Sequence, residues 1–138
     1  MPMKTRIFLF FCFAVSLLGC QKDELSRTKT NLSRTWVVDK VEIGGIDTTS
    51  TWKSQFVSYS VQFDKDGNYF ENYTTGGFNT QVTEKGEWSL ASDAITLTLV
   101  REDKQLSRVY EIILVDETSL HFSKVGSYPK EEYYLKSK

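Results

Sequence analysis

The chain has 138 residues, of which 25% are charged, and its 17 basic and 18 acidic side chains give a net charge of −1. This length fits one small domain, and the near-neutral balance excludes a strongly basic surface for nucleic acid. Its two cysteines, Cys12 and Cys20, lie near the N-terminus, so the rest of the sequence has no thiol for a disulfide, a metal cluster or a catalytic nucleophile.

Residues 1–19 have the features of an export signal. Lys4 and Arg6 precede an apolar run from Ile7 to Gly19. This run is shorter than the ~20 residues that a helix needs to span a bilayer, so we expect it to be a cleaved lipoprotein signal peptide. Without Lys4 and Arg6 the mature chain has a net charge of −3.

The residues around the expected cleavage site resemble two targeting motifs. Leu17-Leu18-Gly19-Cys20 resembles the lipobox of bacterial lipoproteins, which implies that Cys20 carries acyl groups such as palmitate and anchors the chain in a membrane. Gln21-Lys22-Asp23-Glu24 resembles the surface-export signal of Bacteroidota lipoproteins. The two resemblances imply an outer-membrane protein at the cell surface, with the periplasmic face as the alternative.

Residues 20–31 are mainly polar and include a single leucine. Such a segment buries little apolar area, so we expect a flexible tether. The folded domain is then expected to occupy residues 32–138.

Beyond the tether, apolar and polar residues alternate with the period of two that is typical of β-strands. The stretch Trp36 to Ile43 is rich in β-branched residues, and alternation recurs at 59–63, 95–99 and 119–123. From about residue 64 onward, every polar break has the length of a hairpin turn. We therefore predict an all-β fold, a single up-and-down antiparallel barrel of about eight strands, in which closure leaves no open edge.

One connection, from Gly44 to Val57, is longer than the others. Trp52 and Phe56 are four residues apart and would lie on one face of a helical turn, which Ser50 or Thr51 would cap. The spacing predicts a short helix or lid over one mouth of the barrel, with an irregular loop as the alternative.

Three groups of residues, in this order, resemble the lipocalin-like domains of Bacteroidota lipoproteins. They are Tyr59-x-Val61-x-Phe63-x-Lys65-Asp66-Gly67-x-Tyr69, Gly86-x-Trp88-Ser89-Leu90 before Ile95-x-Leu97, and Tyr110-x-Ile112 before Leu120-x-Phe122. The resemblance covers about residues 32–138 and implies a calycin-type barrel with a mouth for a ligand. Of the Gly-x-Trp motif that opens true lipocalins, only Trp36 is present.

Aromatic side chains are the candidates for a ligand-binding interior. An eight-stranded barrel is either filled by side chains or holds one small ligand, and the sequence leaves both alternatives open. Gly86 lies two residues before Trp88, so we expect space beside that ring, and Glu84 and Arg108 are expected on the same faces as Trp88 and Tyr110. The candidate ligand-binding residues are Trp36, Trp52, Phe56, Tyr59, Phe63, Trp88, Tyr110 and Tyr133.

Other motifs favour structural roles. Asp64-Lys65-Asp66-Gly67-Asn68 lacks the glycine and glutamate positions of a calcium-binding loop, so we expect a hairpin turn. Glu84 and Glu87 are three apart in a strand and so lie on opposite faces, which argues against a glycosidase pair. His121 is the only histidine, and we expect a polar surface or lumen residue without a catalytic or metal-binding role.

Asp47-Thr48-Thr49 resembles the motif for O-glycosylation of exported Bacteroidota proteins, and this resemblance implies a sugar on Thr48. The sequence predicts no metal and no cofactor. The leading hypothesis is a non-enzymatic lipoprotein whose barrel binds a small apolar or amphipathic ligand. The alternative is an interaction module that docks on an envelope protein or a glycan.

Overall fold

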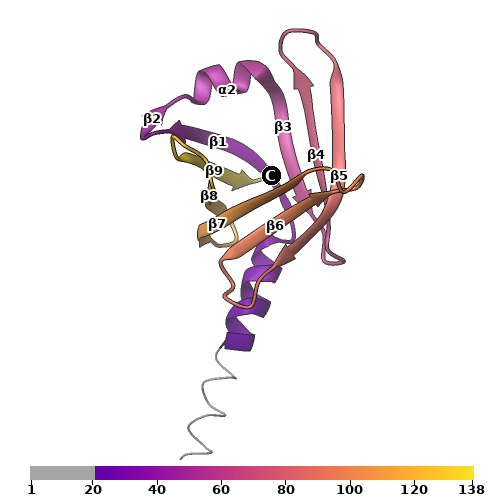
Figure 1. The fold of residues 1–138 in the computed structure, drawn as a ribbon, viewed down its shortest axis with the longest axis vertical. Coiled ribbons are helices and arrows are strands. Elements are labelled where there is room, and N and C mark those ends of the chain that lie inside the picture. Colours follow the sequence, from indigo (N-terminus) through magenta and orange to yellow (C-terminus); the bar gives the residue numbers. More distant parts are fainter. Residues whose placement is uncertain (1–20) are drawn as a thin grey trace, which may run out of the picture.

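The computed structural model describes residues 21–138, which contain one antiparallel sheet (Figure 1). Its strands are β1 (Thr35–Ile43), β2 (Ile46–Asp47), β3 (Phe56–Phe63), β4 (Asn68–Thr75), β5 (Gln81–Leu90), β6 (Thr96–Arg101), β7 (Ser107–Val115), β8 (Ser119–Lys124) and β9 (Glu131–Ser137). The strand order is β2-β1-β3-β4-β5-β6-β7-β8-β9, and β1 also pairs with β9. This pairing closes eight strands into a barrel, while β2 pairs with the end of β1 alone. The predicted up-and-down barrel is therefore confirmed.

The core of the barrel consists of the apolar side chains that alternate along the strands. Leu97 and Leu99 on β6 point inward and are at most 3% exposed, whereas their neighbours Thr96 and Thr98 are half-buried. Trp36 and Phe63 are also buried. Full burial of a side chain such as Leu or Phe contributes ~1.5–3 kcal/mol, so these residues supply much of the stability.

The turn between β3 and β4 contains the predicted Asp64 to Asn68 segment. One carboxylate oxygen of Asp64 accepts hydrogen bonds from the backbone N–H groups of Asp66 and Asn68, at 2.9 and 2.8 Å. Gly67 has a φ of +91°, which a residue with a side chain rarely adopts. The carboxylate is thus used to close a hairpin, as the sequence predicts.

The long connection after β2 contains a short helix, α2 (Thr49–Gln55), as predicted. Thr48 is its N-cap residue, and the Asp47 carboxylate accepts a 2.9 Å hydrogen bond from the Thr49 N–H. The prediction that Ser50 or Thr51 caps the helix is wrong, because Asp47 closes the turn after β2 and the helix begins at Thr49.

Residues 21–32 are helical, so the prediction of a flexible tether is wrong for this segment. Leu25 and Leu32 are seven residues apart and lie on the same side of a helix, where both pack against the barrel core. The Trp36 indole N–H also donates a 3.0 Å hydrogen bond to the Leu32 carbonyl. Figure 1 shows this helix at the opposite end of the barrel from α2. Among the described residues, neither helix has the length and hydropathy that a membrane crossing requires.

Candidate ligand-binding site

A cavity of about 150 Å³ lies inside the barrel below α2. Its wall combines apolar side chains from the strands with three charged residues, Glu71, Glu84 and Arg108. Six of the eight aromatic candidates line this space, namely Trp52, Phe56, Tyr59, Phe63, Tyr110 and Tyr133. The side chains near the α2 end therefore leave a small space between them.

Aromatic rings from α2 and the strands cover this space. The Trp52 ring stacks on Phe56 with centroids 4.7 Å apart, and its edge contacts the Tyr59 ring at 5.1 Å. Trp52 also meets Tyr133 on β9 edge to face, with centroids 6.3 Å apart. Each such aromatic pair contributes ~0.5–1.5 kcal/mol in addition to the energy of burying its apolar area. These contacts therefore hold α2 against the barrel.

Trp36 and Trp88 do not line the cavity. The Trp36 indole N–H is bound to Leu32 at the end of the helical segment 21–32, and the Trp88 indole N–H donates a 3.0 Å hydrogen bond to the Asp64 carbonyl in the β3–β4 turn. The space that Gly86 was expected to leave beside the Trp88 ring is filled by β6 and Tyr69. A Cβ added to Gly86 would lie 2.1 Å from the Val100 carbonyl oxygen and 2.8 Å from the Tyr69 ring. The glycine thus allows close packing of β6 and Tyr69 and leaves no volume for a ligand.

An ion-pair cluster forms the polar wall of the cavity. Arg108 on β7 donates hydrogen bonds to both oxygens of Glu71 on β4, at 3.1 and 2.6 Å, and to Glu84 on β5, at 2.7 Å. The Glu71 side chain is 5% exposed. In the sheet, β5 and β6 lie between β4 and β7, so the contact between Arg108 and Glu71 spans the lumen.

Two tyrosine hydroxyls complete this cluster. The Tyr59 hydroxyl donates a 2.5 Å hydrogen bond to Glu71, and the Tyr69 hydroxyl donates a longer one, 3.3 Å, to Glu84. Burial, followed by the charge of Glu71, raises the pKa of Tyr59 well above its ordinary value. This hydroxyl therefore stays protonated and remains a donor to the carboxylate at neutral pH.

Electrostatics hold Arg108 in its charged form. Burial alone would lower its pKa, but the hydrogen bonds and charge of Glu71 outweigh burial and raise the pKa above its ordinary value. The cluster consequently contains one guanidinium and two carboxylates, and its formal charge is negative. Burying this charge is costly, so the cluster must either be part of a binding site or be stabilised by its own hydrogen bonds.

Comparison with protein families identifies this barrel. Residues 32–122, from before β1 into β8, match the family described as the lipocalin-like domain. The chain belongs to this family. The lipocalin-like domain is generally a binding fold and not an enzymatic one. No curated protein matches the sequence.

In this lipocalin-like barrel, Glu84 and Arg108 point to the interior, as predicted from the sequence, and Glu71 is an interior residue that was not predicted. The signal for Glu71 is the alternation Tyr69-x-Glu71-x-Tyr73, which puts its side chain on the same face as the two tyrosines. Glu71 also lies directly opposite Glu84 across β4 and β5. Glu87 points away from the lumen and forms a 3.2 Å ion pair with Lys104, as expected for the opposite face.

The remaining candidates lie outside the cavity. The His121 ring stacks on Tyr134, with centroids 3.9 Å apart, and its Nε2 is 3.3 Å from a Glu132 oxygen. The Thr48 side chain is half-buried, and its hydroxyl is 3.4 Å from the Val41 carbonyl. Within residues 21–138, no three His, Cys, Asp or Glu side chains gather closely enough to hold a metal ion.

The targeting motifs are only partly covered by the structure. Cys20 lies outside the described residues. Gln21, Lys22, Asp23 and Glu24 are exposed at the beginning of the described helical segment 21–32.

Proposed function

We propose that this lipocalin-like protein is a non-enzymatic binding protein that holds one small, mostly apolar ligand in the cavity below α2. The observation that carries the proposal is the aromatic-lined space of about 150 Å³ in a fold that generally binds ligands. A cavity of this size in a protein core can hold a benzene molecule. It is below the ~300 Å³ needed by drug-sized ligands, so the proposed ligand is about the size of one ring.

We further propose that the protein acts at the outer membrane, anchored through lipid on Cys20 and facing the cell surface. The support is in the sequence, where Leu17-Leu18-Gly19-Cys20 precedes the charged Lys22-Asp23-Glu24. A glycan on Thr48 is part of the same proposal for an exported protein. Its site is the turn that leads into α2.

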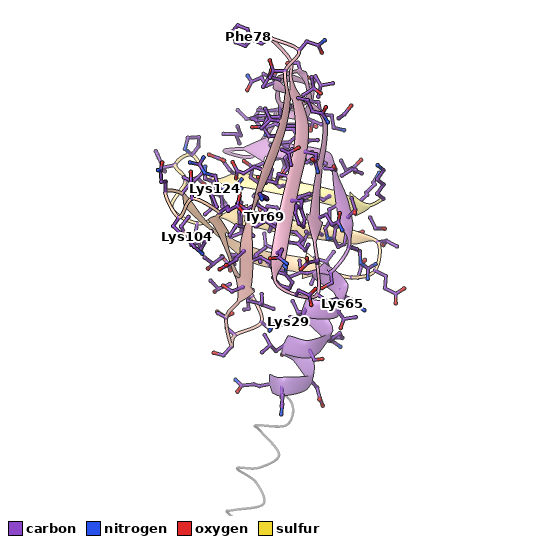
Figure 2. The ribbon with its side chains drawn as sticks, turned by 90° about the vertical axis from the view of Figure 1, so that its right-hand side faces the viewer. Lys29, Lys65, Tyr69, Phe78, Lys104 and Lys124 are labelled. Carbon is purple, nitrogen blue, oxygen red and sulfur yellow. The ribbon has the colours of Figure 1, made fainter. Side chains whose placement is uncertain are left out.

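Docking on an envelope protein or a glycan is the second candidate function. One observation favours it: Phe78, in the loop between β4 and β5, is 89% exposed. Figure 2 shows this side chain at the tip of the hairpin, away from the rest of the barrel. An exposed aromatic ring in such a position is suited to insertion into a partner's pocket.

Titration with a ring-sized neutral probe, benzyl alcohol, tests the ligand-binding proposal. We expect saturable binding by ligand-observed NMR with a dissociation constant near 0.1 mM, equivalent to about −5.5 kcal/mol. Trp52→Ala removes the cover of the cavity and should weaken binding about tenfold, or about 1.4 kcal/mol.

Phe70→Ala is the matched control, because Phe70 is an aromatic residue on β4 that lies on the opposite face of the strand from Glu71 and does not line the cavity. It should leave probe affinity unchanged in the folded protein. If benzyl alcohol and its similarly sized analogues show no saturable binding, the ligand-binding proposal is wrong and docking becomes the better hypothesis.

A further inference from the structure

The polar wall of the cavity has one carboxylate oxygen that is not engaged in a hydrogen bond. Both oxygens of Glu71 accept bonds from Arg108, and one also accepts from Tyr59. Oε1 of Glu84 accepts from Arg108 and Tyr69. Among residues 21–138, Oε2 of Glu84 has only an ion-pair contact with Arg101, at 3.9 Å. This distance is too long for a hydrogen bond, so Oε2 is available to a ligand.

The two arginines near Glu84 are already engaged. Arg108 makes three hydrogen bonds of 2.6 to 3.1 Å to the carboxylates of Glu71 and Glu84. Arg101 binds the Asp103 carboxylate with three hydrogen bonds of 2.6 to 3.0 Å. An anionic ligand would have to displace one of these bidentate pairs before either guanidinium could bind it.

The formal charges of the cavity wall also disfavour an anionic ligand. Glu71 and Glu84 contribute two negative charges to the cavity wall, and Arg108 contributes a single positive charge. Arg101, 3.9 Å from Oε2 of Glu84, does not change this balance because its charge is offset by Asp103 at 2.6 Å. The excess negative charge faces a partly enclosed space, where charge interactions are screened less than in water. A cationic ligand would balance this charge, and an anionic ligand of the same shape would increase the imbalance.

The aromatic side of the cavity also suits a cation. The rings of Trp52, Tyr59, Tyr110 and Tyr133 all line the space. The faces of such rings attract ammonium groups within about 6 Å of the ring centroid. Aromatic rings and a carboxylate oxygen without a hydrogen bond are thus two features of this cavity that would favour a compact organic ammonium group.

We propose that the ligand of this cavity is a small organic amine, about the size of a single ring, whose ammonium group binds Oε2 of Glu84. This inference rests on the proposed function, because it requires that the cavity bind a ligand. It names the chemical class of the ligand, because the cavity should bind an amine more tightly than a neutral compound or a carboxylate of equal size.

Three probes of nearly equal size and different charge test this inference: benzylamine, benzyl alcohol and benzoate. At pH 7 and low salt, we expect benzylamine to bind at least tenfold more tightly than benzyl alcohol, a difference of about 1.4 kcal/mol. Benzoate should bind most weakly. Added salt should reduce the advantage of benzylamine and leave the affinity for benzyl alcohol nearly unchanged.

Glu84→Gln should bring the affinity for benzylamine to within about threefold of that for benzyl alcohol, because it removes the charge and keeps the shape. Glu87→Gln is the matched control, since Glu87 lies on the same strand with a side chain that is 68% exposed and paired with Lys104. It should leave the ranking of the three probes unchanged. Circular dichroism establishes that both variants are folded.

The outcomes separate this inference from the proposed function. If benzyl alcohol or benzoate binds as tightly as benzylamine, the amine inference is overturned and the ligand-binding proposal stands. If none of the three binds, both fail. The ranking in the wild-type protein decides the question on its own, so instability of the Glu84 variant does not prevent a decision.

Discussion

Replacing Arg108 by methionine should destabilise the barrel far more than a surface charge substitution would. The variant keeps most of the apolar stem and removes the guanidinium, so Glu71 loses both hydrogen bonds from Arg108 and keeps only the one that the Tyr59 hydroxyl donates. Glu84 loses its 2.7 Å partner, and the two carboxylates face each other across β4 and β5 without a cation between them. Removing one partner from a buried ion pair costs ~3–5 kcal/mol, and we expect Arg108→Met to fall in this range.

Urea unfolding followed by circular dichroism at pH 7 measures this loss, and thermal melts should show a midpoint lower by ~10–20 °C. The triple variant Arg108→Met, Glu71→Gln, Glu84→Gln should recover part of the stability, because it removes the stranded charges. Lys104→Met is the control, since it breaks an exposed pair with Glu87 and should cost ~1 kcal/mol or less. A loss below ~1 kcal/mol for Arg108→Met would refute the argument that buried charge governs the effect.

Two further predictions concern alkaline pH and the anchor. Burial raises the pKa of Tyr110 from 10.0 to about 12, so between these values the unfolded chain binds fewer protons than the folded one. The contribution of Tyr110 to the free energy of unfolding is fully present below pH 10 and is lost as the pH rises through about 12. Tyr110→Phe should therefore make the free energy of unfolding depend less on pH in this range. Cys20→Ala should move the protein from the membrane fraction to the soluble fraction, because lipid chains contribute ~0.8 kcal/mol per buried methylene. Retention of this variant on membranes at high salt would contradict lipid anchoring.

Those parts of the fold that depend on local patterns were predictable from the sequence. The alternation in 95–99 gives an inward Leu97 and Leu99, and Gly67 supplies the positive φ of the β3–β4 turn. The spacing of Trp52 and Phe56 predicts α2, and the two rings lie together, although Phe56 is the C-cap residue of the helix and begins β3. Each of these features is set by residues close together in the chain, where period and turn chemistry are informative.

The cluster within the cavity depends on closure of the barrel, which local patterns do not describe. Arg108 reaches Glu71 across the lumen from a strand that is not its neighbour in the sheet. The sequence identifies a common inward face for Glu84 and Arg108 but does not give the distance between them. Trp88 was misplaced for the same reason, because the depth of a side chain along the barrel axis depends on strand tilt and register.

The helix at 21–32 was missed because its polar composition resembles that of a disordered segment. An isolated helix of this length is only marginally stable in water. Contact of Leu25 and Leu32 with the barrel core stabilises it here. The spacing of these two leucines is a weak signal, because two apolar residues occur seven apart by chance in many polar segments.

This helix also determines how the barrel is oriented when the protein is attached through its N-terminal side. It packs against one end of the barrel, and α2 with its aromatic cover lies at the other (Figure 1). A group attached before residue 21 would therefore be joined to the end of the barrel opposite α2 (Figure 1), through a helix that adds a spacer of ~18 Å. A surface, a lipid or an affinity tag attached there leaves the α2 end unobstructed. Immobilisation through the N-terminus is thus the orientation that preserves access to the cavity in a binding assay.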